Sequence, residues 1–108
     1  MLLRINFGGE GEEAGHINQQ PPWCTLAAMV ARGGASLQQL VIAGMPLLVC
    51  DNTDLPLPDQ SVDAAVTNGT PIDISTWLGP GVQSSEIKRV LKSGCPWTDN
   101  GIVVFTKP

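Results

Sequence analysis

A run of apolar residues near the middle of the chain limits the possible folds more than any other feature. The run occupies residues 46–50 and is closed by the polar pair Asp51 and Asn52. Hydrophobicity that is continuous rather than alternating is typical of a strand covered on both faces, as in a parallel sheet. Residues 62–67 form a second short apolar segment, followed by the turn Asn68-Gly69. The two segments predict two strands of a parallel sheet.

Other segments supply further strands and several helices. Residues 2–7 alternate apolar and polar side chains and run into a pair of glycines, which predicts a strand that ends in a turn. Residues 84–92 give the clearest helix, with an apolar stripe and a cap at Ser84 or Ser85. We also expect helices at 23–32 and 37–43, a last strand at 102–105, and loops at 10–22 and 71–80.

Strands and helices in this order indicate a single α/β domain over residues 1–108, a normal length for one domain. Right-handed crossovers would make its sheet mostly parallel, with four or five strands and helices on its faces. Ligands of such sheets bind beyond the carboxyl ends of the strands. A binding site is therefore expected near the glycines that follow Phe7, near Asp51 and near Asn68.

The chain is acidic, with six Lys and Arg against ten Asp and Glu and a formal charge of −4. Because nonspecific nucleic-acid binding needs a basic face, we do not expect it here. The longest uncharged apolar stretch, residues 40–50, is shorter than the ~20 residues of a membrane-spanning helix and contains Pro46. The first residues do not resemble a signal peptide, so we expect a cytoplasmic protein that does not enter a membrane.

The cysteines and the single histidine do not predict a metal site. Cys24, Cys50 and Cys95 lie far apart in the sequence and form no C-x-x-C pair, and His16 is the only histidine. We therefore expect three reduced thiols and no bound metal.

The glycine-rich turn after the first predicted strand is one candidate binding site. Gly8, Gly9 and Gly11 would let backbone N–H groups approach a ligand closely, although a tight turn alone also needs glycine. Glutamates at positions 10, 12 and 13 surround this turn. Because carboxylates repel phosphate, we expect a ligand that offers hydroxyl or ammonium donors instead.

The pair Asp51 and Asn52 is a second candidate. A carboxylate and an amide at the end of a strand can accept hydrogen bonds from ribose hydroxyls or from an exocyclic amine. The same pair of residue types is also common at the start of a turn, so a structural role stays open beside the binding role.

Three segments of the chain, in order, resemble motifs of one enzyme family. Residues 3–11 (LRINFGGEG) resemble a first strand with its glycine-rich loop, and residues 51–66 (DNTDLPLPDQSVDAAV) resemble the pattern D-x-x-x-L-P-F-P-D-x-S-F-D-x-V. Residues 86–94 (EIKRVLKSG) resemble the pattern E-x-x-R-V-L-K-P-G-G. Together they resemble the class I S-adenosylmethionine-dependent methyltransferases in abbreviated form. The loops at 68–73 and 78–86 are also similar to methyltransferase-like modules at the C-terminal ends of bacterial polymorphic toxins.

This resemblance implies a truncated, Rossmann-like methyltransferase fold that binds S-adenosylmethionine and transfers its methyl group to an unidentified acceptor. The residues implied to bind the cofactor are Gly8, Gly9, Glu10, Gly11, Asp51 and Asn52. The residues implied to take part in catalysis, by orienting the acceptor, are Asn68 just past the central strand and Asp73 in the same loop.

The sequence leaves two other classes of function open. A degenerate methyltransferase fold could bind a small molecule or a protein without catalysis. The sheet of the family continues beyond the position of Phe105, so an exposed sheet edge could pair with a second copy and form a homodimer. A toxin-like effector that acts on nucleotides or RNA by different chemistry is the other class, and the acidic charge argues against it.

Overall fold

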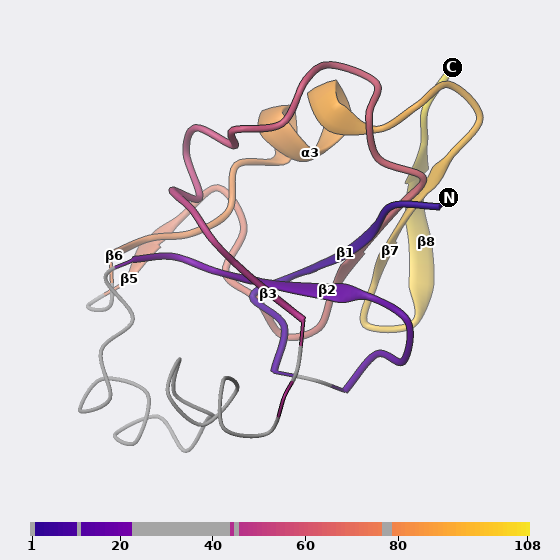
Figure 1. The fold of residues 1–108 in the computed structure, drawn as a ribbon. Helices are drawn as coiled ribbons and strands as arrows, with labels where there is room; N and C mark the ends of the chain where they lie inside the picture. The colour runs from indigo at the N-terminus through magenta and orange to yellow at the C-terminus, as the bar shows by residue number, and fades with distance from the viewer. Residues whose placement is uncertain (1, 11, 23–43, 45, 77–78) are drawn as a thin grey trace.

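A mixed, mostly parallel sheet forms the body of the protein. The computed structural model describes residues 2–10, 12–22, 44, 46–76 and 79–108. The main strands are β1 (Arg4–Phe7), β2 (Ile17–Gln20), β3 (Leu47–Val49), β4 (Ala64–Thr67), β7 (Pro96–Asp99) and β8 (Ile102–Thr106). They form one six-stranded sheet in the order β3-β2-β1-β4-β7-β8 (Figure 1).

The pairing of the strands confirms the expected α/β class at a coarse level. β1, β2, β3, β4 and β7 pair in parallel, and β8 returns antiparallel along β7. The sheet has six strands, however, so the expected number of four or five is too low. The predicted strands at 2–7, 46–50, 62–67 and 102–105 are present with slightly different bounds, whereas β2 and β7 were not predicted.

β2 lies inside the segment 10–22 that was expected to be a loop. Its sequence is Ile-Asn-Gln-Gln, and the last three side chains are buried although they are polar. Their amide groups donate to backbone carbonyls: Asn18 to Pro46 at 3.0 Å, Gln19 to Cys50 at 2.9 Å and Gln20 to Gly9 at 2.7 Å. Hydrogen bonds therefore satisfy the buried amide groups of β2. Because these residues are polar, hydrophobic periodicity could not reveal the strand.

β7 follows the helix and also lacks an apolar run. Trp97 is its one buried apolar side chain, and the indole Nε1 donates to Thr67 Oγ1 at 3.0 Å. Thr67 Oγ1 in turn donates to Asp99 Oδ1 at 2.8 Å, so a short chain of hydrogen bonds links β7 to β4. This mixture of polar and apolar residues gave no strand signal.

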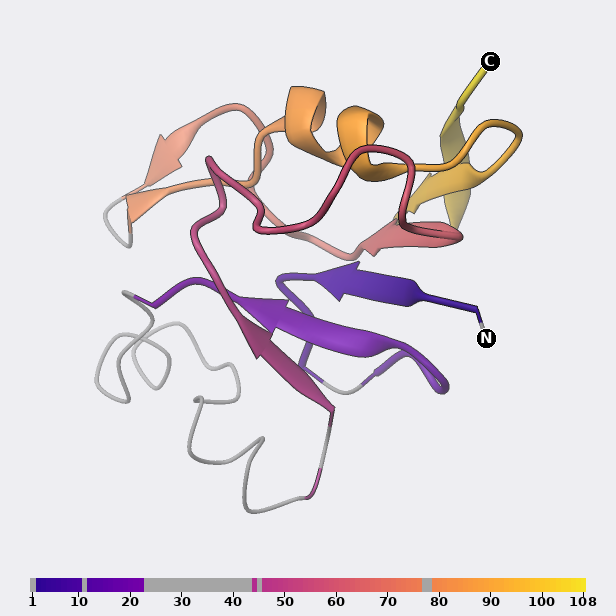
Figure 2. The same cartoon turned by 45° about the horizontal axis from the view of Figure 1, so that its top comes forward.

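One helix, α3 (Ser84–Val90), lies against a face of the sheet among the described residues (Figure 2). Its N-cap is Gln83 and makes no side-chain cap bond, so the expected serine cap is wrong. Asp73, which lies earlier in the chain, caps the helix instead, because its Oδ1 accepts a hydrogen bond from the Ser84 backbone N–H at 2.8 Å. The helices expected at 23–32 and 37–43 lie outside the described residues.

The segment 71–80, expected to be an irregular loop, contains a two-stranded antiparallel sheet. Its strands are β5 (Ser75–Thr76) and β6 (Gly79–Pro80). An isolated bridge between Ile72 and Val82 and a hydrogen bond from Gly81 N to Ile74 O at 2.7 Å hold the two ends of this segment together just before α3. Backbone contacts therefore fix the described residues of the loop after β4.

The hydrophobic core lies between α3 and one face of the sheet. Its members are fully or almost fully buried: Ile5, Phe7, Cys50, Leu55, Val62, Ala65, Val82, Ile87, Val90, Leu91 and Trp97. The helix contributes the apolar stripe that its sequence predicted. No helix among the described residues is long and apolar enough to cross a membrane.

Arg89 fastens the proline-rich loop before β4 to the helix. Its guanidinium donates to Leu55 O at 2.9 Å, to Leu57 O at 2.8 Å and to the carboxylate of Asp59 at 2.8 Å. It also pairs with Glu86 at 2.8 Å, and Glu86 Oε1 accepts the backbone N–H of Leu55 at 2.9 Å. Glu86 and Arg89, which belong to the sequence motif at 86–94, therefore have a structural role.

Candidate functional site

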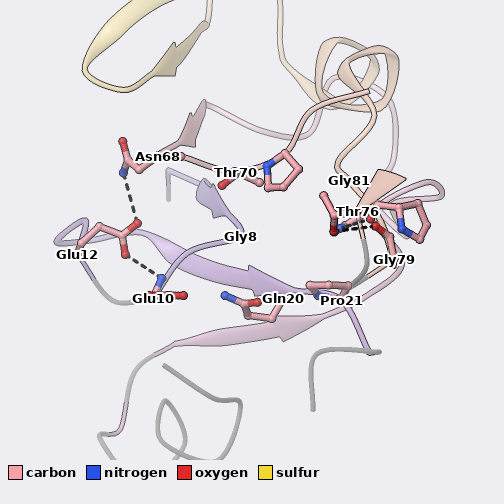
Figure 3. Close-up of a pocket in the computed structure, with 14 residues that line it drawn as sticks. Gly8, Glu10, Glu12, Gln20, Pro21, Asn68, Thr70, Thr76, Gly79 and Gly81 are labelled. Carbon is pink, nitrogen blue, oxygen red and sulfur yellow. Dashed lines mark hydrogen bonds between the residues drawn. The ribbon is translucent and has the colours of Figure 1, made fainter. Parts of the chain in front are cut away.

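A cavity opens at the carboxyl ends of the parallel strands, where a ligand site was expected. Its volume is about 390 Å³ (Figure 3). One wall comes from the turn after β1, with Gly8, Glu10 and Glu12. The floor includes Gln20 at the end of β2 and Asn52 beyond β3, and the opposite wall comes from residues 68–71, 76 and 79–81 after β4. Segments far apart in the chain thus enclose one space.

The turn after β1 packs directly against the loop after β4. Gly8 has a φ of +72°, and a Cβ at this position would lie 2.6 Å from Thr70 Oγ1. The Thr70 hydroxyl donates to Phe7 O at 2.9 Å, and Gly8 N donates to Gln19 O at 2.8 Å. Only glycine allows both this backbone conformation and this close approach.

The other glycines of the turn are placed differently. Gly9 does not line the cavity; a Cβ there would lie 2.6 Å from Asn18 Oδ1 and from Asn6 Nδ2, so its small size serves packing. Gly11 lies outside the described residues.

Glu12 is the central acidic group of the site. Its Oε1 accepts from Asn6 Nδ2 at 2.7 Å, and its Oε2 accepts from the backbone N–H of Glu10 at 2.8 Å. Burial raises the pKa of this carboxyl, but these hydrogen bonds together with one from Asn68 outweigh burial and lower the pKa below its ordinary value. Glu12 is therefore ionised at neutral pH.

Asn68 reaches the same carboxylate from the end of β4. Its Nδ2 lies 3.3 Å from Glu12 Oε1 and 3.1 Å from Glu13 Oε1. Figure 3 shows the amide nitrogen directed at Glu12 and the carbonyl oxygen directed away from it. The predicted catalytic residue Asn68 thus lines the cavity, with its orientation set by two carboxylates.

Asn52 lines the cavity, but its neighbour Asp51 does not. Asn52 is 5% exposed; its Oδ1 accepts from Gln19 Nε2 at 2.8 Å and its Nδ2 donates to Pro80 O at 3.1 Å. Asp51 is exposed, and its carboxylate accepts from the backbone N–H and the hydroxyl of Thr53 at 2.8 and 2.7 Å. These hydrogen bonds lower the pKa of Asp51 and shape the turn.

Asp73, the second predicted catalytic residue, also lies outside the lining of the cavity. It has a φ of +57° and its carboxylate accepts hydrogen bonds from the hydroxyl and the backbone N–H of Ser84 at the start of α3. These bonds lower the pKa of Asp73. The structure therefore brings Gly8, Glu10, Asn52 and Asn68 together and places Asp51 and Asp73 elsewhere.

Several cavity residues were not identified individually in the sequence. Glu12 belongs to the group of glutamates whose charge was noted, and that group was the available signal. Gln20 was missed together with its strand, and Thr70 and Gly81 gave no signal of their own. A Cβ on Gly81 would lie 2.5 Å from Pro71 O, which explains the glycine at this point in the wall.

The chemistry of the lining favours a ligand with positive charge or with hydrogen-bond donors. Carboxylates and side-chain amides face hydroxyls from Thr70 and Thr76, and among the described residues no lysine or arginine lines the cavity. An anionic ligand would meet Glu10 and Glu12 without a compensating cation. No group of three or more metal-ligating side chains occurs in the described part of the chain.

Comparisons with known proteins found no match: no family model, no curated protein and no solved structure resembles the chain closely enough to be counted.

Proposed function

We propose that this chain binds S-adenosylmethionine in the cavity and transfers its methyl group to an acceptor. One observation supports this most directly. Two of the three segments that resemble methyltransferase motifs, 3–11 and 51–66, contribute Gly8 and Asn52 to the same cavity, and Asn68 just past the second segment lines it too. The third segment, 86–94, does not line the cavity.

The size and the charge of the cavity suit this cofactor. A volume of about 390 Å³ lies within the range of small-molecule sites, roughly 300–1,000 Å³. S-adenosylmethionine carries a positively charged sulfonium, a positively charged ammonium group and one carboxylate, so its net charge is positive. Glu10 and Glu12 would face these charges, and the lowered pKa of Glu12 keeps its carboxylate ionised for that contact.

The lining also offers partners for the nucleoside half of the cofactor. Gln20 ends β2 and Asn52 lies beyond β3, and both line the cavity with amides rather than carboxylates. Their nitrogens donate to Gly9 O and Pro80 O, so the amide oxygens are the groups that would accept from the cofactor, Asn52 Oδ1 in addition to its bond from Gln19. Amides accept hydrogen bonds from ribose hydroxyls and from an exocyclic amine. Gly8 lets the turn after β1 pack closely on Thr70, because a Cβ there would lie 2.6 Å from Thr70 Oγ1.

The strand order supports the finer part of the fold hypothesis. A central β1, with β2 and β3 on one side and β4 and β7 on the other, suits a Rossmann-like sheet whose ligand lies at the point where the order reverses. α3 covers one face of this sheet. We propose that helices cover both faces of the sheet, as in a Rossmann-like fold.

When bound, S-adenosylmethionine supplies an electrophilic methyl group on a positively charged sulfur. The chain then has to hold and orient the reactants rather than form a covalent bond. Asn68 Oδ1, directed away from Glu12, would accept a hydrogen bond from the N–H or O–H of the acceptor. Because its pKa is lowered, Glu12 is a weak base and serves in binding and orientation.

A binding module without catalysis is the second candidate function. Asp73 favours it, because the carboxylate expected to assist catalysis is engaged with Ser84 and lies outside the cavity lining.

Titration with S-adenosylmethionine, followed by an assay for S-adenosylhomocysteine release, tests the proposal. Saturable binding and release of S-adenosylhomocysteine in the presence of a small-molecule cell extract support the enzyme. Binding without release supports the binding module. Absence of binding by folded protein contradicts both roles for this cofactor.

A further inference from the structure

Asn6 lies in the middle of the sheet, on the face opposite the hydrophobic core. It pairs in register with Asn18 of β2 on one side and with Val66 of β4 on the other. Its chain neighbours Ile5 and Phe7 belong to the core. Because successive side chains of a strand point to opposite faces, Asn6 points away from that core. Asn6 is fully buried, and asparagine is rarely buried so deeply unless its polar atoms are paired.

The side-chain amide of Asn6 is paired on its nitrogen but not on its oxygen. Nδ2 donates to Glu12 Oε1 at 2.7 Å. Oδ1 is the one buried side-chain polar atom among the described residues that has no hydrogen-bond partner, which lowers the stability of the fold. Turning the amide over would bring Oδ1 against the carboxylate oxygen, so the contact with Glu12 determines its orientation. The fold thus keeps an unpaired buried oxygen and, with it, the contact to Glu12.

Asn6 makes the shortest of the hydrogen bonds that hold this carboxylate. The backbone N–H of Glu10 donates to Glu12 at 2.8 Å, and Asn68 Nδ2 lies at 3.3 Å (Figure 3). Glu13 is a further carboxylate close by, because it shares the Asn68 amide at 3.1 Å. The Asn6 donor is fixed by the central strand, whereas the other two donors belong to turns that border the cavity.

The donors around Glu12 are neutral, which leaves its negative charge in place. Glu86, by contrast, is paired with the guanidinium of Arg89 at 2.8 Å. Among the described residues no lysine or arginine lines the cavity, so the charge of Glu12 remains available to a ligand.

We propose that Asn6 is a positioning residue, which holds the carboxylate of Glu12 at the wall of the cavity as a fixed negative charge for a cationic ligand. Asn6 itself does not line the cavity and acts through Glu12. That the ligand is S-adenosylmethionine rests on the proposed function, whereas the hold of Asn6 on Glu12 does not.

Loss of the Asn6 donor should change the protonation of Glu12. Burial raises the pKa of Glu12, and the hydrogen bond from Asn6 is the largest of the effects that lower it. Asn6→Ala removes this bond, so the pKa of Glu12 should rise. Asn6→Asp keeps the shape of the side chain but places a second carboxyl against Glu12, and two such groups share a proton.

Carbon-13 NMR titration of the glutamate carboxyls in the ligand-free protein tests this step, with Glu12→Gln to assign the Glu12 signal. The midpoint of Glu12 in the native protein should lie below the ordinary glutamate value of ~4.3. It should move to higher pH in Asn6→Ala, and less far in Asn68→Ala, which removes a longer bond. Ile87→Val is the control: Ile87 is buried in the core on α3, so the change lowers stability without removing a donor to Glu12, and the midpoint should stay unchanged.

Calorimetric titration with S-adenosylmethionine at neutral pH tests the consequence for the site. Asn6→Ala should bind about tenfold more weakly than the native protein, and Ile87→Val should bind like the native protein. If the folded native protein does not bind this compound, the proposed function fails, and the NMR titration alone decides on Asn6.

Circular dichroism establishes that each variant is folded. If Asn6→Ala is not, Asn6→Asp decides, because its carboxyl pair should release its last proton above the ordinary carboxyl range. Three results would overturn the proposal: a native Glu12 midpoint at or above the ordinary value; a midpoint that removal of the Asn6 amide leaves unchanged; or native-like binding of S-adenosylmethionine by Asn6→Ala.

Discussion

Glu12 and Asn68, 56 positions apart in the sequence, meet at one end of the cavity, with Asn68 Nδ2 at 3.3 Å from Glu12 Oε1. The contact joins the turn after β1 to the end of β4 across the site. It sets the direction of the Asn68 amide and adds to the hydrogen bonds that keep Glu12 ionised. The residue proposed to bind the cofactor and the residue proposed to orient the acceptor are thus parts of one hydrogen-bonded unit.

Replacing Gly8 by alanine should destabilise the protein more than the same change at Gly94. Both glycines have positive φ, +72° and +80°, so both variants carry the backbone cost of about 1–2 kcal/mol. At Gly8 the new Cβ would also lie 2.6 Å from Thr70 Oγ1, whereas at Gly94 nothing lies within 4 Å. Urea unfolding measures both losses. Equal losses would show that the close packing of Gly8 on Thr70 is not significant.

Arg89→Ala should lower the free energy of unfolding by more than Lys88→Ala does, because Glu86 and the carbonyls of Leu55 and Leu57 lose a charged partner. Lys88→Ala on the same helix is the control. Lys88 is exposed and lies over the ring of Phe105 at 4.9 Å, a contact worth about 0.5–1 kcal/mol at an exposed site. Thermal or urea unfolding compares the two variants. A loss of stability in Lys88→Ala as large as that in Arg89→Ala would contradict the role of Arg89 in holding the loop before β4 to α3.

Acidification should destabilise the fold through Glu86. The hydrogen bond with Arg89 lowers the pKa of Glu86 in the folded state, although burial opposes this. A carboxyl with a lowered folded-state pKa contributes stability that is complete above its unfolded pKa of ~4.3 and is lost as the pH falls through the folded value. Urea unfolding between neutral and acidic pH should show this loss. Glu86→Gln should have a weaker pH dependence below that value; an unchanged pH dependence would refute the assignment to Glu86.

The sequence predicted the strands that contain an apolar run, and it failed where burial is polar. β3 and β4 follow from apolar runs, but β3 was expected to be covered on both faces and is instead an edge strand whose Val49 is 45% exposed. α3 follows from the apolar stripe of Ile87 and Val90. β2 could not be predicted in this way, because Asn18, Gln19 and Gln20 are buried by hydrogen bonds to carbonyls that only the folded sheet brings near.

The candidate site shows the same difference between what local sequence predicts and what long-range contacts decide. Gly8 and Asn68 were predicted because glycines and polar residues at strand ends follow from local sequence. Asp51 and Asp73 have equally suitable side chains, but their hydrogen bonds go to Thr53 and Ser84, and local sequence does not reveal which partner a carboxylate finds. The position of Glu12 beside Asn68 depends on the pairing of β1 with β4, which is a long-range property.

Calorimetric titration with S-adenosylmethionine tests the central claim most directly, using the native protein, Glu12→Gln and Asp54→Asn. Asp54 is exposed and lies outside the cavity lining, so its variant controls for the loss of one negative charge. We predict saturable binding by the native protein, native-like binding by Asp54→Asn, and binding weaker by about tenfold or more in Glu12→Gln, which corresponds to about 1.4 kcal/mol. No binding by the folded native protein, or equal binding by Glu12→Gln, would contradict the assignment of this cavity.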